Sequence, residues 1–383
     1  MAVLTRARTV PMMRVLVVNC GSSSVKLRML DDADAVTGGV DLPATAGEFS
    51  LASLRQALSE LGPADAVGHR IVHGGREFRG PVRLDDRVVA GITELRDLAP
   101  LHQSFGLAGI RAVGELLPDV PAVACFDTAF HADLPYAAAT YPVPAEWRER
   151  YAIRRYGFHG LSHAYAARRA AELTGLDPAS ARVVTCHLGS GASLAAVRGG
   201  RSVDTTMGFT PLEGIVMGTR SGTVDPGLVL WLQTDAGMSA AEVSRALQAD
   251  SGLVALAGTQ DMAVILDRYR AGDRAARRTL DVYLHRLRAG IAAMTAALGG
   301  LDALVFTGGI GEHAPEVRAG AADGLAFLGL AVDPDRNASV RVPDADVTAA
   351  GATVRTLLVA AREDVEIAGQ VRAVLSDRDV KHT

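Results

Sequence analysis

The chain has 383 residues, of which 49% are hydrophobic; it can bury a large core, and at about 150 residues per domain we expect two domains. Its 39 basic and 43 acidic residues leave a formal net charge of −4, which gives no general attraction to nucleic acid or to an anionic membrane. Cys20, Cys125 and Cys186 lack C-x-x-C spacing, which argues against a disulfide framework or a zinc cluster. With no secretory signal and no apolar run of about 20 residues, a cytoplasmic protein with small-molecule partners is expected.

The first predicted element is a β-hairpin that occurs a second time further along the chain. A short apolar segment, a turn of Gly and Ser, and an alternating segment follow one another in both places. The four strand-like segments are Arg14–Asn19, Val25–Leu30, Arg182–His187 and Leu194–Val197. Aligning Asn19 with His187 superposes Gly21 on Gly189. A repeat with so long a period predicts two similar domains, each beginning with a hairpin, rather than a solenoid.

Helices are predicted where apolar residues recur every three or four positions. These segments are Ser50–Leu61, Gly106–Leu117, His163–Leu173, Ser239–Leu247 and Arg274–Leu298. A further strand at Ala303–Phe306 leads into a third glycine-rich turn. Strands that alternate with helices predict an α/β protein.

Two of the glycine-rich turns have features of phosphate-binding loops. Gly21–Lys26 offers backbone N–H groups, three hydroxyls and an ammonium group, which suit a phosphate chain. It is not a Walker A loop, because strand-like residues follow it where that loop requires a helix. The third turn, Gly309–Ala314, fits the dinucleotide pattern G-x-G-x-x-[GA], but too little chain follows it for a complete Rossmann sheet. The alternative interpretation, a dinucleotide-dependent oxidoreductase, would depend on this turn alone.

Polar side chains stand beside glycine and aromatic residues in the middle of the chain. The segments are Gly68–Gly75, Leu101–Gln103, Phe126–His131 and Tyr156–His163. His159 and His163 have the spacing of one helix face, but no H-E-x-x-H pattern accompanies them and Gly160 weakens a helix there, so zinc is not favoured. The long segment Asp204–Pro226 mixes Gly, Thr and charge with apolar residues, which predicts an ordered functional loop with Arg220 as its candidate residue.

Taken in order, these segments resemble the acetate kinase family of the acetate and sugar kinase, Hsp70 and actin superfamily. The matching motifs are Asn19–Lys26, His69–Gly75, Phe126–His131, Gly157–His163, the loop of Arg220 and Gly309–Glu312. The resemblance implies an α/β fold of two related actin-like (ribonuclease H-like) domains with a cleft between them. Residues 1–129 and 361–383 would form the N-terminal domain, and residues 130–360 the C-terminal, nucleotide-binding domain.

The resemblance also implies an activity, the reversible transfer of a phosphoryl group from ATP to acetate, which gives acetyl phosphate and ADP. The metal would be Mg²⁺, with Mn²⁺ as the alternative. A small carboxylic acid is already ionised at pH 7, so the attacking oxygen needs no general base. Catalysis must instead hold two anions together and neutralise the charge on the transferred group, which calls for arginine, histidine and metal. A homodimer is also implied.

The resemblance assigns roles to individual residues of this sequence. The catalytic residues would be Asp127, His159, Arg220 and His102. Arg70 would bind the carboxylate or the migrating phosphoryl group, and the methyl group of acetate would be enclosed by Val72, Leu101, Phe158 and Pro211. Asn19 and Glu363 would belong to the magnesium site, and we favour a role for Asp127 in organising the metal. The nucleotide would contact Ser22, Ser24, Lys26, His187, Leu188, Gly189, Ser190, Gly191, Asp261, Met262, Ala263, Gly309, Ile310, Gly311, Glu312 and His313.

The sequence departs from the family pattern mainly on the nucleotide side. Ser190 and His313 replace the usual asparagines, and Ala263 stands where arginine is expected. Because of these departures, a phosphoryl donor other than ATP remains an alternative. Propionate or butyrate as the acceptor, and an actin- or Hsp70-like ATPase without an acceptor, are the remaining alternatives.

Overall fold

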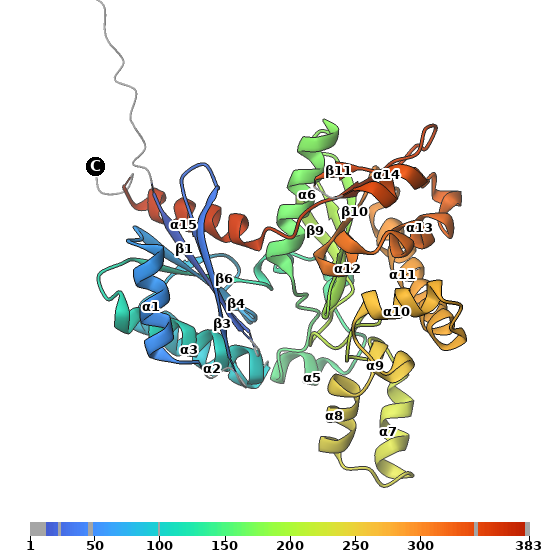
Figure 1. Ribbon diagram of the computed structural model, residues 1–383. Coiled ribbons are helices and arrows are strands. Elements are labelled where there is room, and N and C mark those ends of the chain that lie inside the picture. The colour runs from blue at the N-terminus through green and yellow to red at the C-terminus, as the bar shows by residue number, and fades with distance from the viewer. Residues whose placement is uncertain (1–12, 22–23, 45–48, 99, 341–343, 380–383) are drawn as a thin grey trace, which may run out of the picture. The chain divides into compact units, whose positions relative to one another are not determined.

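The computed structural model describes residues 13–21, 24–44, 49–98, 100–340 and 344–379. The chain divides into two compact units (Figure 1). The first comprises Met1–Gly74, Gly80–Phe126 and Asp364–Thr383, and the second comprises Gly75–Arg79 and Asp127–Glu363. No helix among the described residues is both long and apolar enough to cross a membrane.

The first unit is built on a mixed six-stranded sheet with the order β3-β2-β1-β4-β6-β5. Its strands are β1 (Val15–Cys20), β2 (Ser24–Leu30), β3 (Val36–Pro43), β4 (Ala66–Ile71), β5 (Val82–Arg83) and β6 (Ala122–Phe126). β1 pairs with β2 as the predicted hairpin and runs parallel to β4, which runs parallel to β6. Asn19 on β1 and Arg70 on β4, two of the functional residues predicted in this unit, therefore lie near the carboxyl ends of neighbouring parallel strands.

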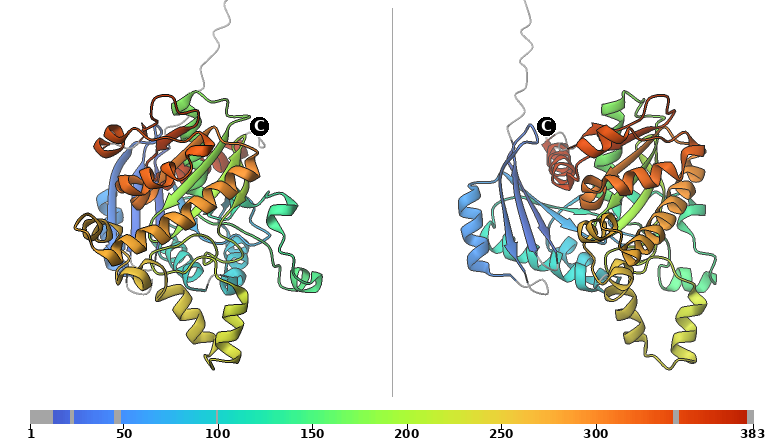
Figure 2. Two further views of the ribbon diagram at one scale, coloured as in Figure 1. Left: turned by 90° about the vertical axis from the view of Figure 1, so that its right-hand side faces the viewer. Right: turned by 45° about the vertical axis from the view of Figure 1, so that its right-hand side comes forward.

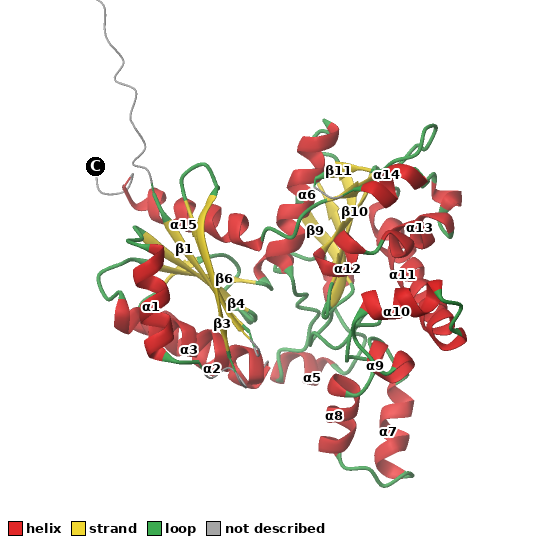
Figure 3. Cartoon of the chain, in the orientation of Figure 1, coloured by secondary structure: helices red, strands yellow, loops and turns green. Residues whose placement is uncertain are grey.

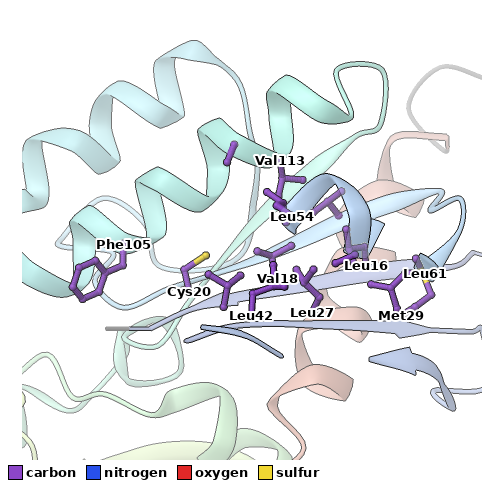
Figure 4. Close-up of a cluster of buried hydrophobic side chains, with 14 residues drawn as sticks. Leu16, Val18, Cys20, Leu27, Met29, Leu42, Leu54, Leu61, Phe105 and Val113 are labelled. Carbon is purple, nitrogen blue, oxygen red and sulfur yellow. The ribbon is translucent and has the colours of Figure 1, made fainter. Parts of the chain in front are cut away.

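Helices cover both faces of this sheet. They are α1 (Leu51–Leu61), α2 (Asp86–Glu94), the 3₁₀ helix η1 (Leu95–Leu98), α3 (Pro100–Leu116) and α15 (Glu363–Asp379). Alternate residues of β1, Leu16 and Val18, are fully buried in a cluster with Leu54 of α1 and Val113 of α3 (Figure 4). On the opposite face a Cβ added to Gly68 of β4 would lie 2.4 Å from Ile367 of α15, so glycine is what allows α15 to pack so closely.

The second unit repeats the topology of the first. Its sheet has the order β11-β12-β10-β7-β8-β9. The strands are β7 (Arg182–Leu188), β8 (Ala192–Arg198), β9 (Arg201–Thr205), β10 (Ala303–Thr307), β11 (Ala345–Asp346) and β12 (Arg355–Leu358). β7, β8, β9, β10 and β12 correspond to β1, β2, β3, β4 and β6, with the same parallel and antiparallel pairings. Even the two-residue strand at the edge recurs, since β5 and β11 each pair antiparallel with the last parallel strand. The prediction of two related α/β domains is thus confirmed.

Helices also lie on both faces of the second sheet (Figures 2 and 3). Helix α6 (Gly160–Thr174) covers one face and α11 (Arg274–Leu298) the other. The other helices of this unit are η2 (Ala129–His131), α4 (Tyr136–Ala139), α5 (Ala145–Arg150), α7 (Pro226–Thr234), α8 (Ala240–Ala249), α9 (Gly252–Ala257), α10 (Met262–Arg270), α12 (Gly308–His313), α13 (Pro315–Asp323), η3 (Ala326–Leu328) and α14 (Pro334–Ser339). The alanines of α6, including Ala166 and Ala170, pack on Val183 of β7. On the other face Gly290 of α11 lies against Leu194 of β8. The small residues let both helices approach the strands closely.

Candidate active site

The two hairpins end in turns that are similar but differ in length. Four residues separate Cys20 from its partner Val25, and three separate Leu188 from Ala192. Each turn is closed by a backbone hydrogen bond from its glycine, Gly21 N to Ser24 O at 2.9 Å and Gly189 N to Gly191 O at 3.0 Å. Of the predicted nucleotide contacts in the first turn, Ser22 lies outside the described residues. Ser24 begins β2, and Lys26 is exposed on that strand.

Arg70 and Asn19 meet in the first unit. Arg70 is the last but one residue of β4 and pairs with Cys125 of β6, and its Nη1 donates to Oδ1 of Asn19 on β1 at 3.2 Å. Val72 follows on a backbone segment that the buried Gln103 holds, because Gln103 Nε2 donates to the carbonyl of His73 at 2.9 Å. The predicted anion ligand and the predicted metal ligand therefore belong to one hydrogen-bonded pair.

The two other predicted residues of this unit, Leu101 and His102, lie in the first turn of α3. Their side chains are outside the described part of the structure, so their roles stay predictions. α3 begins at Pro100, six residues before the predicted helix start, and proline is well tolerated in the first turn of a helix.

Asp127 and His159 are brought together through the start of α6. Asp127 is only 1% exposed, and its carbonyl accepts a hydrogen bond from Gly160 N at 2.9 Å. A Cβ at Gly160 would lie 2.2 Å from that carbonyl oxygen, so only glycine fits there. His159 occupies the N-cap position in the left-handed region, with φ of 57°, an unfavourable conformation that is held by its surroundings.

His159 and Arg220 converge over the turn of the second hairpin. A Cβ added to Gly191 would lie 2.8 Å from Nη2 of Arg220 and 3.3 Å from Nε2 of His159. Arg220 is anchored by its other terminal nitrogen, Nη1, which donates to the carbonyl of Pro211 at 2.7 Å. Burial lowers the pKa of Arg220 from its usual value, although a guanidinium stays protonated at neutral pH. Two side chains that can carry positive charge thus lie around Gly191, a residue with no side chain.

The orientation of His159 is fixed by a chain of hydrogen bonds that runs into the core. His159 Nδ1 lies 2.9 Å from Ser193 Oγ, and the same oxygen lies 2.8 Å from His163 Nε2. His163 Nδ1 lies 2.7 Å from Thr185 Oγ1. Thr185 directs its hydroxyl proton to a backbone carbonyl at 3.5 Å, so it accepts from His163 Nδ1.

The protonation of His163 sets the direction of this chain. His163 is fully buried, and burial lowers its pKa well below the usual value, so it is neutral with a single N–H. Since that N–H is at Nδ1, Nε2 accepts from the hydroxyl of Ser193, and Ser193 in turn accepts from Nδ1–H of His159. The Nε2 atom of His159 lies beside Gly191, as Nη2 of Arg220 does.

The long loop predicted at Asp204–Pro226 is ordered and is held by a buried polar cluster. Arg155 makes an ion pair with Glu213 at 2.9 Å and donates to the carbonyl of Met207 at 3.2 Å. Tyr141 donates to Glu213 and accepts from the backbone N–H of Phe209. These bonds fix the loop on both sides of Pro211, which holds Arg220.

Next to this loop, Phe158 of the predicted acetate pocket is 1% exposed. Pro211 is half-buried. The sequence did not identify Ser193, Glu213 and Tyr141 as residues that position the site. The hairpin repeat was the one signal near any of them, because Ser193 lies in the second hairpin.

The predicted nucleotide residues of the second unit lie at the ends of β7 and β10. A Cβ at Gly308 would lie 2.8 Å from the carbonyl of Leu188, so the turn between β10 and α12 packs on the end of β7. Glu312 Oε1 accepts from Gly308 N at 3.1 Å and from Ala361 N at 3.0 Å. Its carboxylate therefore braces this turn, and Gly309 beside it is exposed.

A buried arginine closes the carboxyl end of α12. Arg318 is 1% exposed and donates to the carbonyls of Gly311 at 2.8 Å and of Glu312 at 3.0 Å. It also donates to Asn337 Oδ1 at 2.7 Å, and burial lowers its pKa to about 10. A cation at this helix end satisfies carbonyls that have no partner within the helix.

The remaining nucleotide residues lie around Gln260. Ser190 Oγ donates to Gln260 Oε1 at 3.2 Å, and Asp261 caps α10 by accepting from Ala263 N at 2.8 Å. Met262 is 4% exposed, so its side chain belongs to the core.

The other predicted nucleotide contacts lie elsewhere in the unit. The ring of His187 stacks on the ring of His159, with centroids 4.3 Å apart. His313 and Ile310 lie on the short helix α12.

Comparison with known proteins gives one consistent result. The model of the acetokinase family matches residues 40–369. An acetate kinase of Gloeobacter violaceus is 50% identical over 315 residues, which are 82% of this chain and 77% of that relative. The crystal structure of Porphyromonas gingivalis acetate kinase is similar with a TM-score of 0.87 at 34% identity and covers 95% of this chain and 100% of its own. A propionate kinase from Francisella tularensis subsp. tularensis has the same TM-score at 33% identity, with the same coverage.

Proposed function

The chain belongs to the acetokinase family, and from this premise we propose that it transfers the terminal phosphoryl group of ATP to acetate, reversibly, to give acetyl phosphate and ADP. A kinase with a carboxylate acceptor and a nucleotide co-substrate agrees with the matched family and relatives. The observation that carries the proposal is the convergence of Arg220 and His159 on the glycine turn at Gly191.

The chemistry follows from charge. A carboxylate oxygen attacks the terminal phosphorus, the bond to the bridging oxygen breaks, and ADP leaves; no proton needs to move, because acetate is already ionised. Two anions must approach each other, and the charge spreads over the equatorial oxygens of the transferred group. We assign the carboxylate to Arg70 and the equatorial oxygens to Arg220 and to the Nε2–H that His159 has as an imidazolium, with His102 as a further contact. Val72, Leu101, Phe158 and Pro211 would enclose the methyl group.

The proposal includes a magnesium ion with the nucleotide. Asp127 is buried directly after β6 and Glu363 begins α15, and their carboxylate oxygens, with the amide oxygen of Asn19, are hard donors of the kind Mg²⁺ prefers. No three His, Cys, Asp or Glu side chains gather into a metal site in the described part of the chain. In nucleotide enzymes Mg²⁺ is usually held by one or two carboxylates together with the substrate phosphates, so a larger cluster is not required. When bound, the ion would neutralise phosphate charge; Asp127 and Glu363 would hold it.

We further propose that the protein works in the cytoplasm as a homodimer. Its three cysteines are free and buried, and burial raises the pKa of Cys20 to about 12, which keeps this thiol protonated and unreactive.

The test is a hydroxamate assay with MgATP and a panel of carboxylic acids. Acetate should give acetyl hydroxamate with stoichiometric ADP. ADP formation that does not depend on any acid would instead support an ATPase. Propionate stays a second candidate because a propionate kinase has the same fold, and one methylene changes binding by only about 1–3 kcal/mol. A panel of phosphoryl donors tests whether Ser190, Ala263 and His313 have changed the nucleotide preference.

A further inference from the structure

An arginine-lined cavity lies in the second unit, apart from the residues assigned to the reaction. It has a volume of about 530 Å³ and is lined by Arg76, Arg79, Arg148 and Arg154, with Asp133 as the single carboxylate. The wall is completed by Leu134, Tyr136, Ala139, Thr140 and Ile153, together with Ala132. A smaller cavity shares Arg76, Arg79 and Arg154 and reaches Thr128 and Tyr156. The volume is in the range of sites for small organic molecules.

The positive charge of this cavity is largely uncompensated. Arg79 makes an ion pair with Asp133. The charge of Asp133 also acts on Arg154, so this one carboxylate faces two of the four arginines. The hydrogen bonds that Arg76, Arg148 and Arg154 donate within the described residues go to neutral groups. Arg76 donates to the carbonyl of Arg148 at 2.9 Å, and Arg154 donates to the carbonyl of Ala132 at 3.2 Å. In a chain with a formal net charge of −4, such a local excess is unusual and points to an anionic ligand.

The arginines are also held in place. Arg148 donates from one nitrogen to the carbonyls of Tyr141 and Val143, both at 3.1 Å. Arg154 donates a second bond, to the carbonyl of Arg155 at 3.2 Å, and lies over the ring of Tyr156 at 5.8 Å. Burial lowers the pKa of Arg154, and the charges of Arg79 and Arg76 lower it further. Guanidinium groups fixed in this way lose little entropy when they bind an oxyanion.

We propose that this cavity binds a small organic anion with at least two phosphate or carboxylate groups. Planar guanidinium forks match both oxyanions in bidentate geometry. Two or more negative groups are required to balance Arg76, Arg148 and Arg154, and a carbon frame between them would contact Leu134 and Ile153. The site is distinct from the assigned acetate and nucleotide residues, so the proposal does not depend on the proposed function.

The experiment is isothermal titration of the full chain with pyrophosphate and, separately, with citrate, in metal-free buffer. Binding should weaken at least tenfold in Arg76→Gln and in Arg154→Gln, and as ionic strength rises. Thr140→Glu places a negative charge in the cavity without removing any arginine, so it should abolish binding even if the arginine variants fold poorly. Arg150→Gln is the matched control, because Arg150 is exposed on the same helix, α5, as Arg148, but does not line the cavity.

The residues assigned to the reaction can also bind these anionic probes. Arg220→Ala distinguishes the two sites, because Arg220 does not line the cavity. The proposal requires that Arg220→Ala keeps the binding that Thr140→Glu loses. It is overturned if neither probe binds the wild-type chain, if Thr140→Glu binds as tightly as the wild type, or if Arg220→Ala alone loses binding. Tighter binding of pyrophosphate identifies the ligand class as phosphorylated. Tighter binding of citrate identifies it as a polycarboxylate.

Discussion

At the scale of single residues, the second unit holds two side chains, those of His159 and Arg220, in fixed orientations. His159 is held in a left-handed backbone conformation by the bond between Gly160 and Asp127, and its ring by Ser193. Arg220 is tied to the carbonyl of Pro211. A donor that is already oriented costs no reorganisation when charge develops on the phosphoryl group.

Ser193 is expected to act through His159. Ser193→Ala removes the acceptor for Nδ1–H of His159, so kcat should fall about tenfold, the worth of one hydrogen bond to a charged group, with little change in the KM for acetate. In a His159→Ala background the same substitution should have no further effect on kcat. An equal loss of kcat in both backgrounds would show that Ser193 affects activity through general destabilisation.

Arg220→Ala should lower turnover by about 10²- to 10³-fold, the usual effect of removing one transition-state donor. Thermal unfolding should change little, because the side chain of Arg220 donates one hydrogen bond within the described residues, to Pro211, and is partly accessible. Steady-state kinetics in the hydroxamate assay measures the effect. Turnover close to that of the wild type would refute the role assigned to this arginine.

At the scale of elements, several of the predicted functional residues follow the end of a strand. Asp127 follows β6, the Gly189 turn follows β7 and the Gly309 turn follows β10. Parallel strands bring such ends to one edge of a sheet, and glycine then lets the following helix or turn approach. The start of α6 on Asp127 is the tightest of these approaches.

Gly160→Ala should therefore disturb the site strongly. The added Cβ would meet the carbonyl of Asp127 at 2.2 Å, so α6 must move, and we expect both a loss of stability of about 1–3 kcal/mol and a large loss of activity. Gly114→Ala is the control, because Gly114 lies inside α3 with open space around it. That substitution should stabilise the protein slightly. A Gly160→Ala protein with wild-type kinetics would contradict this account of the helix start.

At the scale of the whole molecule, the buried histidines make stability depend on pH. Burial lowers the pKa of His69, His73 and His131 to about 4 each. In the unfolded chain these groups have the ordinary value near 6.5. Below pH 6.5 the unfolded state therefore binds protons that the folded state does not, and the free energy of unfolding falls as the pH is lowered toward 4.

Each such histidine should contribute about 1.4 kcal/mol per pH unit to that slope. Urea unfolding at pH 7, 6 and 5 measures it. His131→Gln should reduce the slope, because the replacement does not titrate. An unchanged slope in His131→Gln would rule out the contribution of this residue.

The sequence by itself determined the two hairpins, the long helices and the duplication, whereas the central strands β4 and β6 were not predicted. The helix over Arg274–Leu298 was predicted with its observed bounds, and both hairpins appear where apolar and alternating runs predicted them. β3 was not predicted, because Val36–Pro43 contains two glycines and little alternation, and its position comes from pairing with β2. Local periodicity reports which face of an element is buried, so it identifies long, amphipathic elements and misses short edge strands.

Only the tertiary structure decided how the candidate residues meet. His159, Ser193 and Arg220 are far apart in the chain, and no spacing rule relates them, yet β7, β8, α6 and the long loop place them around Gly191. The arginine cavity likewise draws Arg76 and Arg79 to a surface with Arg148 and Arg154. Such contacts arise from packing between elements, which a one-dimensional pattern does not encode. The residue types were set by the sequence; their directions were set by the fold.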